Sequence, residues 1–162
     1  MKNIKSQITD RGSTLLLKFV VIFLAIAAIC LFVFLLYISI TSDSVGIFRP
    51  ILLGICATEI PFLYALYQAH RLLLFIDRNE AFSNASIKAL NKIKLSAFTI
   101  SLMFTGGMPY IYYVGEVDDA PGVILMGLLL AAVPFIAAVF AAVLLKLFRN
   151  GLNIKSENDL TI

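Results

Sequence analysis

Four long apolar segments alternate with polar connections along this chain. They cover about residues 15–40, 51–76, 95–114 and 121–145. A helix needs about 20 residues to cross a hydrocarbon layer of about 30 Å, and each segment reaches that length. Lipid offers the backbone no hydrogen-bond partners, so such segments fold as helices. The pattern predicts an all-α fold: an integral membrane four-helix bundle that forms one domain over 1–162, with helices at about 14–40, 50–76, 84–114 and 120–148.

The third helix is expected to begin before its apolar segment. Ser83 is placed as an N-cap, and apolar residues follow it at helical spacing. Lys88 and Lys92 then lie on the opposite side of the same turns. The spacing predicts an amphipathic cytoplasmic extension of the third helix.

The other helix ends also carry local signals. Asp119 can cap the fourth helix, whose first turn holds Pro121. The sequence "RNG" at 149–151 is typical of a helix stop, which would leave 149–162 as a polar cytoplasmic tail. Residues 1–13 are polar and are expected to be loosely ordered. The fourth helix is rich in Gly and Ala, which lets helix backbones approach closely in lipid and leaves self-association of the chain open.

The composition supports a membrane location. The chain of 162 residues is 60% hydrophobic and 14% charged, whereas soluble domains are about 45–50% apolar and about 25% charged. A signal peptide is not indicated at the N-terminus, because the first apolar run is too long and no small-residue cleavage site closes it. The net charge of +3 is modest and does not indicate direct nucleic-acid binding.

The cationic side chains are sorted between alternate connections. Cytoplasmic segments of membrane proteins concentrate Lys and Arg. Here every Lys and Arg except Arg49 falls before the first helix core, between the second and third, or after the fourth. The opposite connection "GEVDDAPG" holds three acids and no base. The charges predict a multi-pass protein of the bacterial cytoplasmic membrane with both termini in the cytoplasm.

An acidic residue and three prolines interrupt the apolar segments at similar depth. The residues that could form an intramembrane polar site are Glu59, Pro61, Thr105 and Pro134. Transporters build ion and substrate sites from broken helices and buried acids. A structural role explains the same residues as well as a transport role does. Prolines shape helix bundles, and a lone protonated carboxyl can donate one hydrogen bond. Both interpretations stay open, with the structural one favoured.

Enzyme chemistry is not indicated. His70 is the one histidine, which excludes a metal cluster of several histidines. The sequence holds no phosphate-binding loop, dinucleotide fingerprint or zinc-protease motif, so we expect no catalytic residues, no metal and no cofactor. The acids Glu116, Asp118 and Asp119 could meet a cationic peptide from outside, which would suit an immunity or envelope-stress protein. They are equally explained as a translocated loop with a helix cap.

Several stretches resemble the YoaS-like family of bacterial membrane proteins of unknown function. They are "RGSTLLLK" (11–18), residues 60–94, "DDAPG" (118–122) and "IKSENDLTI" (154–162). Members of that family are four-helix membrane proteins often encoded beside a small helix-turn-helix regulator of the Cro/CI type. The resemblance therefore implies a role in signalling to, or sequestering, such a regulator at the membrane. Glu59 and His70 depart from the family pattern, which weakens the transport interpretation.

Taken together, these features favour a non-enzymatic regulatory or interaction protein that acts through its cytoplasmic face. A small transporter or channel-like protein that uses Glu59 is the main alternative. The expected partners are the lipid bilayer and a small helix-turn-helix regulator. The candidate contact residues share the cytoplasmic side: Arg78, Glu80, Lys88, Lys92, Glu157 and Asp159.

Overall fold

The chain folds into four long helices and one short 3-10 helix. The computed structural model describes the backbone of residues 2–78 and 80–159 and the side chains of 14–42, 45–78 and 80–154. Its elements are α1 (Lys2–Thr41), η1 (Asp43–Phe48), α2 (Arg49–Asp77), α3 (Asn84–Val117) and α4 (Pro121–Asp159). The described residues include no strand. The all-α, four-helix prediction is confirmed.

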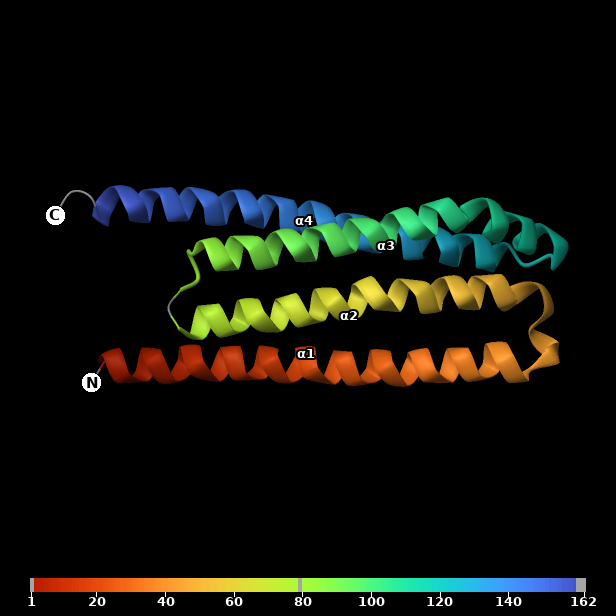
Figure 1. Cartoon of the computed structure of the whole chain (residues 1–162), viewed down its shortest axis with the longest axis horizontal. Coiled ribbons are helices and arrows are strands. Elements are labelled where there is room, and N and C mark those ends of the chain that lie inside the picture. The colour runs from red at the N-terminus through yellow and green to blue at the C-terminus, as the bar shows by residue number, and fades with distance from the viewer. Residues whose placement is uncertain (1, 79, 160–162) are drawn as a thin grey trace.

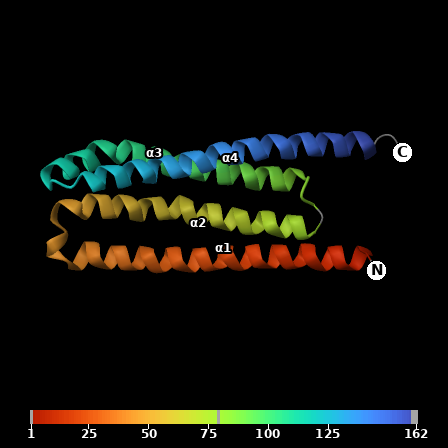
Figure 2. The same ribbon diagram turned by 180° about the vertical axis from the view of Figure 1, so that it is seen from behind.

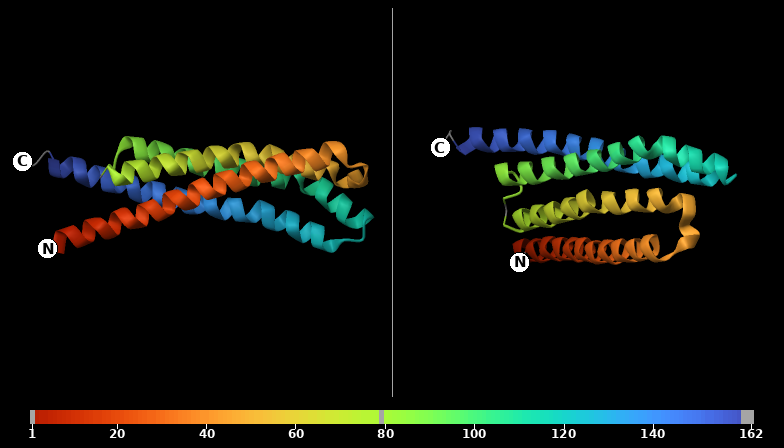
Figure 3. Two further views of the ribbon diagram at one scale, coloured as in Figure 1. Left: turned by 90° about the horizontal axis from the view of Figure 1, so that it is seen from below. Right: turned by 45° about the vertical axis from the view of Figure 1, so that its right-hand side comes forward.

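The helices lie antiparallel in the order α1, α2, α3, α4, each beside its neighbour in the sequence (Figures 1 and 2). α3 makes its main contacts with α2 and α4, whereas α1 packs chiefly on α2. A second set of views shows the same order (Figure 3). The bundle is therefore open, because α1 and α4 do not close it into a ring.

One end of the molecule gathers the start of α1, the connection 78–83 and the end of α4 (Figure 1). We call it the basic end, because the sequence places there every Lys and Arg except Arg49. The other end holds η1 and the turn between α3 and α4, which carries the three acids of the sequence "GEVDD". We call it the acidic end.

α1 meets α2 along a single narrow seam. The less exposed side chains of α1 alternate at spacings of three and four, the pattern of a helix that packs on one neighbour. The seam consists of Lys18, Val21, Ala25, Ala28, Phe32, Leu35 and Ser39. Apolar side chains outside the seam are open, as shown by Phe19 at 71% and Ile40 at 78% exposure. A surface of this size and apolarity requires lipid around it.

α3 and α4 form the closest helix pair. The small residues expected to allow such an approach do lie between them, as Gly127, Ala131, Ala138 and Ala141 are buried. A Cβ atom at position 127 would lie 2.8 Å from Cγ2 of Ile111. The backbone of α4 thus rests directly on α3 side chains.

Three of the four helices are long and apolar enough to cross a membrane by themselves. Within the described residues these are 14–41, 45–77 and 121–154. α3 falls short because Ser, Thr, Gly and Tyr side chains interrupt its apolar segment. Its position between α2 and α4 explains why it tolerates them: protein, not lipid, covers much of its surface.

Both outer helices extend further than the sequence predicted. α1 begins at Lys2, so the expectation of a loosely ordered segment over 1–13 is wrong. α4 continues to Asp159, so the expected helix stop at 149–151 is also wrong. Gly151 is helical because it serves packing: a Cβ atom there would lie 2.6 Å from the Phe82 ring.

The caps of α3 also differ from expectation in one respect. The Ser83 side chain accepts a hydrogen bond from the Ser86 N–H at 3.2 Å, which confirms it as the N-cap. Asp119 belongs to the end of α3 and not to the start of α4. Its φ is +48°, and the next N–H, of Ala120, donates to the Gly115 carbonyl. This is a Schellman turn, which closes α3 before Pro121 opens α4.

Candidate functional site

Three buried polar atoms lack a hydrogen-bond partner, and all three belong to α2. Among the described residues they are Glu59 Oε2, Gln68 Oε1 and His70 Nδ1. An unpaired buried polar atom costs about 1–3 kcal/mol, so such atoms are uncommon and call for an explanation. α2 is therefore the helix in which to look for a function.

Glu59 and His70 lie on the side of α2 that faces α1. Glu59 precedes Asp77 by about five helical turns and His70 precedes it by about two, so the three share one face. Asp77 marks that face, because it forms an ion pair with Lys18 of α1. Glu59 is 7% exposed. The acid expected at mid-membrane is thus buried in the α1–α2 seam.

The helix interruptions are supported by hydroxyl groups. Ser101 of α3 donates to the Ala131 carbonyl of α4 at 2.9 Å, next to the carbonyl of residue 130 that Pro134 leaves unpaired. Thr105 donates in turn to the Ser101 carbonyl at 2.8 Å. Thr58 donates to the Ile55 carbonyl at 2.7 Å, one turn before Pro61. These contacts give the prolines a structural explanation.

The four residues of the predicted intramembrane site are consequently not gathered in one place. Thr105 and Pro134 are linked through Ser101 across α3 and α4. Pro61 is half-buried in α2, and Glu59 faces the α1 seam.

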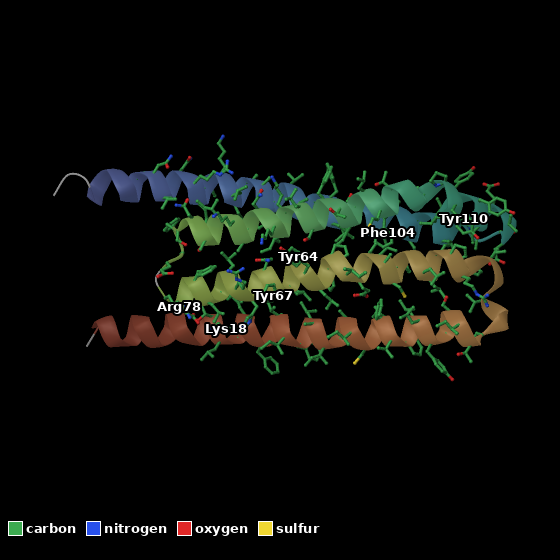
Figure 4. The ribbon with its side chains drawn as sticks, in the orientation of Figure 1. Lys18, Tyr64, Tyr67, Arg78, Phe104 and Tyr110 are labelled. Atoms are coloured by element: carbon green, nitrogen blue, oxygen red, sulfur yellow. The ribbon has the colours of Figure 1, made fainter. Side chains whose placement is uncertain are left out.

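A cavity of about 190 Å³ opens between α2 and α3 in the acidic half of the molecule. Gly54 and Gly107 create the space, and Phe104 and Tyr110 help to line it. Figure 4 shows these two aromatic residues along α3, toward the acidic end. The Tyr110 hydroxyl also donates to the Ile47 carbonyl at 2.9 Å, which ties α3 to η1. The lining is mostly apolar and does not include Glu59.

A polar and aromatic cluster lies between α2 and α3 near the basic end. The Tyr64 hydroxyl interacts with the Lys92 ammonium of α3 and with the Gln68 amide. Gln68 is 1% exposed. One turn further along α2, Arg71 lies over the rings of Tyr67 and Phe75, at 6.0 and 5.7 Å from their centroids. Gln68 was missed in the sequence, where its signal is a lone amide in an apolar run.

The predicted cytoplasmic contact residues divide into two groups. Arg78, Glu80, Lys88 and Lys92 are all exposed, and the Lys92 ammonium also lies 5.8 Å from the centroid of the Tyr64 ring. The side chains of Glu157 and Asp159 lie outside the described residues.

The connection between α2 and α3 is anchored at both sides. The Glu80 N–H donates to the Phe75 carbonyl at 2.9 Å, and the Ser86 hydroxyl donates to the Glu80 carbonyl at 2.9 Å. Phe82 packs against Phe148 of α4 in a tilted arrangement, with ring centroids 5.5 Å apart. The backbones of Arg78 and Glu80 are therefore each held against the end of α2.

The three acids of the acidic end are exposed, and their contacts do not gather them into one binding site. Glu116 accepts a hydrogen bond from Tyr112. Asp118 and Asp119 shape the Schellman turn through their backbone. The described residues contain no group of three or more His, Cys, Asp or Glu side chains that could hold a metal ion.

The helices and their open apolar surfaces define a multi-pass membrane protein. The family model described as a protein of unknown function, DUF2975, matches residues 40–162, and the chain belongs to this family. The chain is also 42% identical, over 160 residues, to the uncharacterized membrane protein YoaS of Bacillus subtilis (strain 168). The match covers 94% of this chain and 99% of that protein. No solved structure matches. The family resemblance seen in the sequence is confirmed.

Proposed function

We propose that this chain is a non-enzymatic interaction protein of the bacterial cytoplasmic membrane. Both termini would lie in the cytoplasm, and the basic end would bind a partner protein there. The observation that carries this proposal is the anchored α2–α3 connection. Exposed Arg78 and Glu80 are each held by a backbone hydrogen bond to the last turn of α2, and Phe82 contacts Phe148 of α4. A surface ordered before binding loses less conformational entropy when a partner docks.

The chemistry of the basic end suits a partner with both signs of charge. Arg78 and Lys88 are exposed cations, and Glu80 is an exposed acid between them in the sequence. The last turns of α4 add acids at positions 157 and 159. A small helix-turn-helix regulator, which the family resemblance implies, is the first partner to test.

A pull-down with a small Cro/CI-type helix-turn-helix regulator as the bait tests this proposal. The full chain in detergent is compared with the double variant Arg78→Ala/Glu80→Ala and with a chain that lacks 152–162. We expect each change to lower recovery about fivefold or more, because a central contact residue is worth more than about 1 kcal/mol. The control, Glu116→Gln/Asp118→Asn, removes two exposed charges at the acidic end and should leave recovery unchanged. Equal recovery from all four proteins would contradict the proposal.

Transport through Glu59 receives less support from the geometry. Its unpaired Oε2 is the observation in its favour. However, the α2–α3 cavity does not include Glu59, and the hydroxyl groups near the proline breaks bond to backbone carbonyls. The acidic end likewise offers a turn and not a pocket for a cationic peptide.

A further inference from the structure

The cluster at the basic end of the α2–α3 interface presents hydrogen-bond donors. The Tyr64 hydroxyl oxygen interacts with both the Lys92 ammonium and the Gln68 amide, which are donors. A hydroxyl whose oxygen accepts from these donors still has its own hydrogen to donate. Gln68 is 1% exposed, so it fixes the position of Tyr64 from behind. The Lys92 ammonium lies 5.8 Å from the Tyr64 ring centroid, so its positive charge lies beside the Tyr64 side chain.

Arg71 adds a second cation to the α2 side of the cluster. Its guanidinium lies over Tyr67 and Phe75, and these rings hold its position without neutralising its charge. Within the described residues the ion pair is Lys18 with Asp77, and neither Arg71 nor Lys92 has a carboxylate within salt-bridge distance. The cluster therefore carries two uncompensated positive charges.

The depth of the cluster matches the phosphate level of a bilayer. Arg71 follows Arg49, at the opposite end of α2, by about 33 Å of helix, close to the thickness of a hydrocarbon layer. Lys92 precedes the apolar segment of α3 by three residues. Tyr67 lies along α2 on the basic side of its centre, and Tyr64 lies close to that centre, beside Lys92 (Figure 4). Tyrosine prefers this boundary, where lipid phosphates also lie.

We propose that Tyr64, Arg71 and Lys92 bind the phosphate of an anionic phospholipid in the leaflet at the basic end. A zwitterionic headgroup would bring an ammonium next to two cations, so the site should prefer a lipid with net negative charge. A guanidinium, an ammonium and a hydroxyl together match the acceptor oxygens of one phosphate. Lys92 would then be a lipid ligand and not a contact for a cytoplasmic protein. The bound lipid would join α2 to α3 near Gln68.

Thermal unfolding of the full chain in detergent tests the site. Phosphatidylglycerol, phosphatidylethanolamine and glycerol 3-phosphate are titrated in parallel. We expect a saturable rise in Tm with phosphatidylglycerol alone. Lys92→Gln and Tyr64→Phe should each weaken that response about fivefold in apparent affinity. The control Lys146→Gln removes one exposed cation of α4 near the same end and should respond as the unmodified chain does.

Tyr64→Phe keeps the ring and its packing, so it separates loss of the hydroxyl from loss of the fold. An equal rise in Tm with phosphatidylethanolamine would overturn the proposal. So would an equal response of Lys92→Gln and Tyr64→Phe to phosphatidylglycerol. Saturation by glycerol 3-phosphate alone would show a site for soluble phosphate and would overturn the lipid as the source.

Discussion

Leucine at position 127 will force α3 and α4 apart and destabilise the fold more than leucine at position 106 of α3. A Cβ atom at this position would already lie 2.8 Å from Ile111 Cγ2 and 3.1 Å from Met108 Sδ. A leucine adds three more carbons to that contact. Both neighbours are held in the α3–α4 interface, so the helices themselves must separate. Overpacking of this kind costs about 1–3 kcal/mol.

The control for this change is Gly106→Leu. Gly106 lies in α3, and a Cβ atom there would meet nothing within 4 Å. Unfolding of the two variants in micelles by increasing denaturing detergent measures the difference. We expect Gly127→Leu to unfold at clearly lower detergent fraction, and Gly106→Leu to unfold close to the unmodified chain. Equal midpoints would show that α3 and α4 do not approach as closely as described.

A lysine at position 26 will disrupt the protein, although Ile26 is an open surface residue. Ile26 is 58% exposed and lies near the middle of the 14–41 span. In water, such a surface substitution changes the free energy of unfolding by no more than about 0.5 kcal/mol. At the centre of a bilayer, replacing isoleucine with lysine costs about 3 kcal/mol. The expected result is poor membrane insertion and a large loss of folded protein.

Ile154→Lys is the matched control. Ile154 is 66% exposed and follows Lys146 and Arg149 at the basic end, where a further cation is tolerated. The yield of folded, monodisperse protein extracted from membranes compares the two variants. We expect Ile154→Lys to match the unmodified chain and Ile26→Lys to be depleted. Equal yields would mean that water, not lipid, surrounds α1.

The sequence predicted those parts of the fold that depend on local chemistry. Apolar segment length predicted four helices, Ser83 predicted the start of α3, and the small residues of α4 predicted a surface for close helix approach. Each follows from a pattern that one helix carries by itself. These features needed no knowledge of how the helices are arranged.

The features that failed depend on a partner segment. Gly151 looked like a helix stop, but its place beneath Phe82 keeps it helical. Asp119 looked like a cap for α4, but the turn that follows α3 uses its left-handed backbone. Neither could be known before α3 and α4 were placed side by side.

The candidate sites show the same limit. Glu59 and Thr105 share a depth in the sequence, yet depth along a helix does not state which neighbour a side chain faces. Glu59 faces α1, whereas Thr105 bonds within α3. Gln68 was overlooked because its importance comes from its burial between helices.

The arrangement of the chain across the membrane is the claim on which the proposed function depends. α3 is the helix that does not qualify as a span by its own composition. If α3 crosses the membrane between α2 and α4, the four crossings return the chain to the side on which it began. If it does not, the two termini lie on opposite sides.

Reporter fusions measure this directly. Alkaline phosphatase, which is active only outside the cytoplasm, is placed after residue 162 or inserted at the turn after Asp118. The same two sites are then tested with a green fluorescent reporter, which fluoresces in the cytoplasm. We predict fluorescence without phosphatase activity after residue 162, and phosphatase activity at the turn. Phosphatase activity after residue 162 would contradict the account.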